Sequence, residues 1–108
     1  MKVYYDLSKS DARNFGLIYV ISGEHKFPSE DWDDFISYII SGWKYEILQN
    51  QKDVFATFTL FFMDGDYYLL CVRCKDYITV LGLKMDDPRY KFKETMLYCD
   101  FEELILSL

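Results

Sequence analysis

The chain has 108 residues, which is enough for one domain built around one hydrophobic core. Hydrophobic residues make up 51% and charged residues 28%, the balance of a folded globular protein rather than a disordered one. The net charge of −6, from 12 basic and 18 acidic residues, opposes direct binding to nucleic-acid phosphates. Such a surface is suited to a basic partner protein, although acidity can also serve solubility alone.

The N-terminal sequence Met1 to Asp6 lacks the apolar segment of a secretory signal. No apolar run approaches the roughly 18 residues that a membrane span needs. Three cysteines are an odd number, and free thiols are typical of a reducing compartment. These features favour a cytoplasmic location with no membrane association.

Taken in chain order, residues 3–7 and 15–22 are β-branched and aromatic runs that predict strands, with a polar loop or one helical turn at 8–14 between them. A helix is then expected over about residues 29–42. Ser29 is a suitable N-cap, and Gly42 is suitable for the C-terminal end. The helical stripe contains Trp32, Phe35, Ile36, Ile39, Ile40 and Trp43.

The remainder of the chain predicts strands at residues 44–49, 54–63, 77–84 and 90–98, and a short helix from about Asp100. No linker or internal repeat divides the chain. The sequence therefore predicts one α+β domain over residues 1–108. Its sheet is expected to be mostly antiparallel and meander-like, with one main helix and a short C-terminal helix.

Asp64-Gly65 lies between two apolar runs and predicts a two-residue type I′ hairpin. That turn fixes the register, pairing Phe58 with Cys71 and Leu60 with Leu69. Both faces of the hairpin are apolar, so we expect it near the middle of the sheet. Cys71 and Cys74 then point to opposite faces of one strand, which argues against a shared metal ion.

The sequence contains no catalytic motif that we could identify. His25 is the single histidine, and its polar neighbours favour a solvated residue over a catalytic base. Phosphate-binding glycine loops, a nucleophile elbow and the calcium-loop pattern are absent from the sequence. We therefore expect no enzyme activity, no cofactor and no metal site.

The segment 29–35, followed by Gly42-Trp43 and by Phe61 to Tyr67, resembles small bacterial immunity proteins. These are encoded beside polymorphic toxins, including those of contact-dependent growth inhibition. The small size, acidity and 19% aromatic content are similar as well. The resemblance implies a cytoplasmic antidote that binds one cognate toxin domain, often a basic nuclease, and occludes its active site or substrate cleft.

The expected toxin-binding surface combines the outer face of the predicted helix with the hairpin tip. Two other interpretations stay open for these acids, because they can serve the helix dipole or the turn instead. Asp86, Asp87, Asp100, Glu102 and Glu103 form a rival acidic patch. The candidate residues for toxin binding are Glu30, Asp33, Asp34, Asp64, Asp66 and Tyr67.

A second hypothesis is a small-molecule-binding or accessory domain. In that case the second apolar face of the sheet, with its tyrosines, would line a ligand cavity of several hundred Å³. A filled sheet face would argue against this function.

Overall fold

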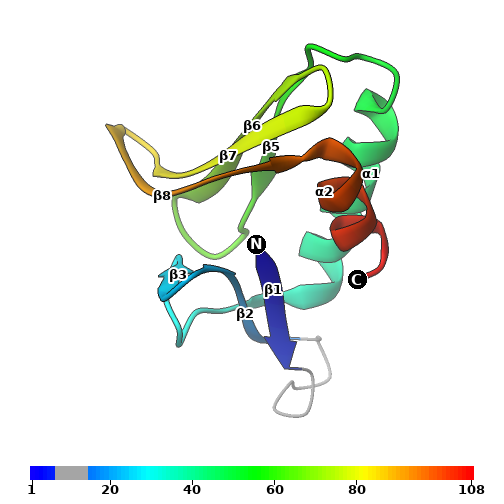
Figure 1. Cartoon of the computed structure of the whole chain (residues 1–108). Helices are drawn as coiled ribbons and strands as arrows, with labels where there is room; N and C mark the ends of the chain where they lie inside the picture. The colour runs from blue at the N-terminus through cyan, green and yellow to red at the C-terminus, as the bar shows by residue number, and fades with distance from the viewer. Residues whose placement is uncertain (7–14) are drawn as a thin grey trace.

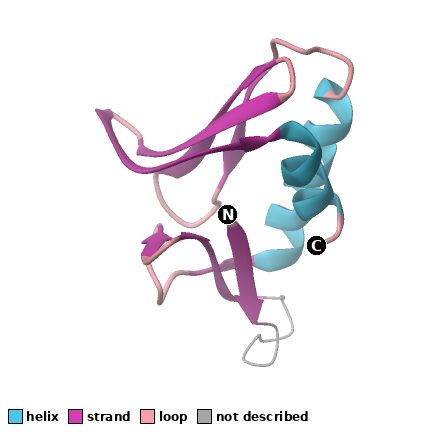
Figure 2. Ribbon diagram, viewed as in Figure 1, coloured by secondary structure: helices cyan, strands magenta, loops and turns pink. Residues whose placement is uncertain are grey.

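The computed structural model of the protein describes residues 1–6 and 15–108. These residues form two antiparallel sheets of four strands each, and two helices lie together on one side of them (Figures 1 and 2). The predicted α+β class, with one main and one short C-terminal helix, is confirmed. The predicted loop 8–14 lies outside the described residues. The elements are β1 (Lys2–Asp6), β2 (Phe15–Ser22), β3 (His25–Phe27), β4 (Asp33–Phe35), α1 (Ile36–Asn50), β5 (Thr57–Phe61), β6 (Tyr67–Cys74), β7 (Tyr77–Lys84), β8 (Asp87–Leu97) and α2 (Tyr98–Leu106).

The first sheet is organised around β2. β1 pairs with one edge of β2, and the short strands β3 and β4 pair with it in succession along the other edge. Burial along β2 alternates, because successive side chains of a strand point to opposite faces. Ile18 and Val20 are fully buried, whereas Leu17 and Tyr19 are half-buried on the outer face.

The second sheet is a meander in the order β5-β6-β7-β8. Its inner face supplies Leu60, Leu69, Ile78 and Val80, all with exposed fractions of 0%. The chain then enters α2 directly from β8. This helix begins at Tyr98 rather than at Asp100, and no side chain caps its N-terminus.

One hydrophobic core joins both sheets and both helices. α1 contributes its buried stripe, and α2 contributes Phe101 and Ile105. Neither helix in the described part of the chain is long and apolar enough to cross a membrane. The buried residues of α1 are Ile36, Ile39, Trp43 and Ile47.

The main helix is displaced along the chain from the predicted range 29–42. It begins at Ile36 and continues to Asn50, so the strand predicted at 44–49 is wrong. Residues 33–35 instead form β4, and the Trp32 carbonyl accepts a hydrogen bond from the Ile18 N–H at 3.0 Å. The helix continues past Gly42 because Trp43 and Ile47 extend its buried stripe. Tertiary burial therefore outweighs the low helix propensity of glycine.

The hairpin register is confirmed, because Phe58 pairs with Cys71 and Leu60 pairs with Leu69. The type I′ turn is wrong. Gly65 has a φ of +123°, but Asp64 is not among the residues of positive φ. The hairpin also lies at a different place in its sheet than expected: β6 is an inner strand, whereas β5 is an edge strand that pairs with β6 alone.

Candidate interaction surface

The carboxylate of Asp34 is fully buried at the start of α1. Its Oδ2 accepts hydrogen bonds from the Met63 N–H at 2.9 Å and the Asp64 N–H at 3.0 Å. The same oxygen accepts the indole N–H of Trp32 at 3.0 Å, and Oδ1 accepts the Phe35 N–H at 2.7 Å. Four donors thus satisfy a buried charge, as burial of a carboxylate requires. This network ties the segment before α1 to the tip of the β5–β6 hairpin.

Aromatic packing strengthens the same junction. The ring of Trp32 meets the ring of Tyr67 edge-on, with 5.1 Å between centroids. A Cβ on Gly65 would lie 2.8 Å from Trp32 Cη2, so glycine is needed there for close approach as well as for its φ. The two segments that carry the candidate residues are therefore in direct contact.

The candidate residues differ in exposure. Glu30, Asp33, Asp64 and Asp66 are exposed, and the structure brings them to one end of the molecule. Asp34 was expected on the outer face of a helix, but it lies in β4 with its carboxylate turned inward. Asp34 is a structural anchor, because both of its carboxylate oxygens accept hydrogen bonds from within the protein. None of these acids lies on α1, so the expectation that they serve its dipole is also wrong.

Tyr67 and Asp31 lie on the same two segments as these acids. Tyr67 is half-buried between Trp32 and Phe27, so only part of its ring is available to a partner. Asp31 is exposed and accepts a hydrogen bond from the Ser29 hydroxyl at 2.7 Å. Asp31 was not among the candidate residues. The term "acidic end" below refers to Glu30, Asp31, Asp33, Asp64 and Asp66.

The rival acidic patch does not exist as one surface. Asp86 lies in the turn between β7 and β8 and Asp87 begins β8, whereas the other three acids lie on α2 at the opposite side of the molecule (Figure 1). Asp87 is also paired with Arg89 at 3.1 Å and with Lys91 at 3.2 Å. Hydrogen bonds from these two cations hold the pKa of Asp87 well below its usual range.

An apolar groove lies beside the acidic end, between α1 and the edge strand β5. It has a volume of about 240 Å³. Its rim carries large side chains with unusually high exposure: Tyr38 is 68% exposed and Tyr45 is 60% exposed. This groove was not expected from the sequence, because neither the helical continuation past Gly42 nor the edge position of β5 was predicted. The lining residues are Tyr38, Ile39, Gly42, Trp43, Tyr45, Glu46, Thr59, Leu60, Phe61 and Met63.

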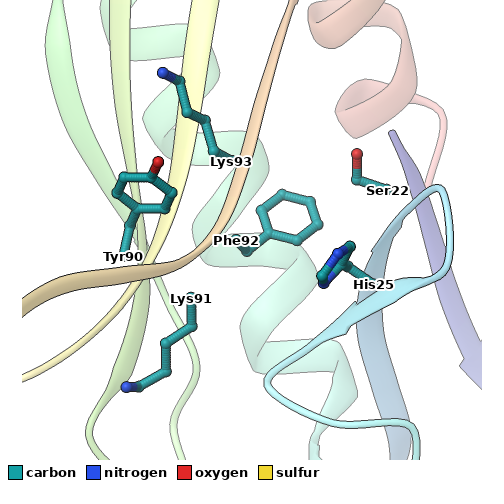
Figure 3. Close-up of a pocket in the computed structure, with 6 residues that line it drawn as sticks. All are labelled: Ser22, His25, Tyr90, Lys91, Phe92 and Lys93. Carbon is teal, nitrogen blue, oxygen red and sulfur yellow. The ribbon is translucent and has the colours of Figure 1, made fainter.

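A second hollow of about 240 Å³ lies between β8 and the β2–β3 turn. Figure 3 shows Phe92 between the side chains of β8 and those of Ser22 and His25. Lys91 is engaged by Asp87, and Lys93 lies 5.8 Å from the ring centre of Tyr90. The two lysines therefore do not converge on a common point.

The histidine and the cysteines were considered as potential metal ligands. His25 lies exposed in β3 rather than in a loop. Cys71 is buried and Cys74 is exposed, as expected for opposite faces of a strand. Over residues 1–6 and 15–108, no group of three or more His, Cys, Asp or Glu side chains is placed to hold a metal ion.

Comparison of the chain with known proteins identified no related protein. No protein-family model matches it, and searches of the curated proteins and of the solved structures returned no significant match. The function must therefore be argued from the surfaces described above.

Proposed function

We propose that this protein is an immunity protein that binds and neutralises a cognate bacterial toxin domain in the cytoplasm. The partner is a basic domain, and a nuclease fits best because nuclease clefts hold phosphates with cationic side chains. The protein occludes the active site or the substrate cleft of the toxin. It uses no catalytic group or cofactor of its own for this purpose.

The observation that carries the proposal is the acidic end, where two segments distant in sequence present five exposed acids beside an exposed apolar rim. Glu30 is paired with Lys26 at 3.1 Å, and the other four acids make no ion pair among the described residues. Complementary charge steers association and raises the on-rate. Exposed aromatic and apolar side chains, such as Tyr38, Phe61 and Met63, are suited to supply most of the binding energy. The combination of charge and aromatic surface favours a protein partner over a small molecule.

Co-expression tests this function directly. The toxin domain encoded beside this protein is expressed in bacteria with the wild-type chain, or with an Asp34→Ala variant whose acidic end should lose its support. We expect the wild type to restore growth and the purified pair to form a one-to-one complex. Equal cell death with and without the wild-type chain would refute the immunity function.

The small-molecule hypothesis receives less support. The two hollows described above each measure about 240 Å³, below the range of roughly 300–1,000 Å³ of typical ligand sites. Each lies at the surface between elements rather than inside the core. No specific observation favours this second function.

A further inference from the structure

The edge strand β5 directs part of its main-chain hydrogen-bonding groups away from its sheet. Phe62 donates to the Tyr67 carbonyl at 3.2 Å, and Arg73 donates to the Ala56 carbonyl at 2.9 Å. Alternation in an antiparallel ladder then directs the N–H and C=O groups of Phe58 and Leu60 toward β6 as well. The main-chain groups of Thr57, Thr59 and Phe61 consequently point away from β6, toward the open edge.

One of these outward groups has a protein partner. The Phe61 carbonyl accepts the indole N–H of Trp43 at 2.9 Å, which confirms its outward direction. Among the described residues, the N–H and C=O of Thr59 and the N–H of Phe61 have no hydrogen-bond partner. Such groups are a template for pairing with another extended chain.

The two edges of the second sheet differ sharply in protection. β8, at the other edge, carries Pro88, Arg89, Lys91 and Lys93, all exposed. Proline and charged side chains are the usual means of preventing strand addition at an edge. β5 has the sequence Thr-Phe-Thr-Leu-Phe, with no charge and no proline. Of these two edges, β5 is the one whose own side chains do not oppose a further strand.

α1 supplies the second wall of the groove beside this open edge. Gly42 leaves space there, because a Cβ at this position would meet nothing within 4 Å. Tyr38 and Tyr45 flank the glycine, and Met63 lies at the end that joins the acidic end. An edge strand facing a helix across an apolar groove is a geometry that accepts extended peptides by strand addition.

We infer that this groove binds an extended segment of the partner protein, which adds to β5 as a further strand. Glu46 is the one charged residue in the lining, and its carboxylate makes no ion pair among the described residues. The bound segment therefore has alternating apolar side chains and a lysine or arginine that faces Glu46. The inference rests on the proposed function only for the identity of the partner as a toxin.

The test is a selection of random octapeptides displayed on phage against the purified wild-type chain. We expect enriched peptides to alternate apolar residues and to carry a basic residue. Selection against Glu46→Gln should retain the alternation and lose the basic residue. If no peptide is enriched, or if the enriched peptides lack alternation, the inference is overturned.

Variants of the groove then locate the binding. Gly42→Tyr fills the groove, and Ser41→Tyr places the same side chain one residue away, outside the lining. We expect Gly42→Tyr to weaken binding of the best peptide at least about tenfold and Ser41→Tyr to leave it within about twofold. Equal affinities for both variants would overturn the inference.

A second variant tests main-chain pairing itself. Thr59→Pro removes an N–H that has no internal partner, so the ladder with β6 keeps its hydrogen bonds. We expect it to weaken peptide binding, and we expect the amides of Thr59 and Phe61 to exchange more slowly with deuterium when the peptide is bound to the wild type. Unchanged exchange at both amides would exclude strand addition.

Two further results separate this inference from the proposed function. If the wild-type chain is a dimer in sedimentation and Gly42→Tyr is a monomer, the occupant is a second copy and the inference is wrong. If the toxin is neutralised equally by wild type and Gly42→Tyr, the immunity function stands and the groove inference fails. If peptides bind as expected but no toxin is neutralised, the groove inference stands and the immunity function fails.

Discussion

The buried carboxylate of Asp34 holds the two segments of the acidic end together. It orients the chain before α1 and the hairpin tip through hydrogen bonds to Trp32, Met63 and Asp64. Its sequence neighbour Asp33 is exposed, and its carboxylate makes no hydrogen bond among residues 1–6 and 15–108. Two adjacent aspartates therefore have different roles, one in folding and one at the surface.

Asp34→Asn should lower the free energy of unfolding by about 2–4 kcal/mol. The amide removes the negative charge and turns an N–H₂ group toward donors that need an acceptor. Urea denaturation of the variant measures the loss. Asp33→Asn is the matched control and should change stability by less than about 0.5 kcal/mol. Similar losses in both variants would show that Asp34 does not anchor the junction.

The three thiols should differ strongly in reactivity. Cys71 is 0% exposed, and burial raises its pKa well above the ordinary value of 9.0. When the native protein is treated with iodoacetamide, Cys74 and Cys99 should be modified at least about a hundredfold faster than Cys71. The Cys71 thiol reacts only after local unfolding exposes it. Mass spectrometry measures the rates. Comparable labelling of Cys71 without denaturant would contradict its burial.

At the scale of elements, local signals in the sequence were sufficient where neighbours in sequence are neighbours in space. The register of β5 and β6 follows from a short connection, and the strands around it follow from alternation. The start of α1 could not be predicted in this way. The pairing of β4 with β2 and the partners of Asp34 come from distant segments, and they prevent residues 33–35 from becoming helical.

The candidate site, like the fold, could be predicted from the sequence only in part. Glu30, Asp33, Asp64 and Asp66 were chosen for their charge; they are exposed, and the two segments that carry them are in contact. The groove was not predictable, because it requires both the continuation of α1 past Gly42 and an unpaired edge on β5. Both are properties of tertiary packing and leave no short-range pattern in the sequence.

Gly42→Ala should raise the free energy of unfolding by about 0.5–1 kcal/mol. Gly42 lies inside α1, is exposed, and has open space where a Cβ would be built. The added methyl group limits the unfolded chain without a steric cost in the helix. Thermal and urea unfolding measure the gain. Gly65→Ala is the opposite case and should be destabilising, because its Cβ would strike the ring of Trp32.

At the scale of the whole molecule, charge is unevenly distributed. Acids gather at the segment before α1 and the hairpin tip, whereas Arg89, Lys91 and Lys93 follow one another along β8. The net charge of −6 is therefore not spread evenly over the described surface. A basic partner should be steered toward the acidic end and away from β8.

A double charge reversal, Asp33→Lys with Asp64→Lys, should slow association with the toxin domain about tenfold at low salt. The difference should disappear at about 0.5 M salt, where the screening length is short. Stopped-flow measurements give the on-rates. Asp76→Lys with Glu103→Lys makes the same change in net charge elsewhere. If this control slows association as much, only net charge matters and the acidic end is not the docking site.

The two indole N–H groups provide a built-in optical probe of these surfaces. The chain has two tryptophans: Trp32 is hydrogen-bonded to the anchor of the acidic end, and Trp43 is hydrogen-bonded to the carbonyl of Phe61 at the groove. A ligand in the groove should therefore change the emission of Trp43, which a Trp32→Phe variant reports alone. Contact at the carboxylates should instead alter Trp32. Fluorescence titration of the unlabelled protein can thus distinguish which of the two regions a binder occupies.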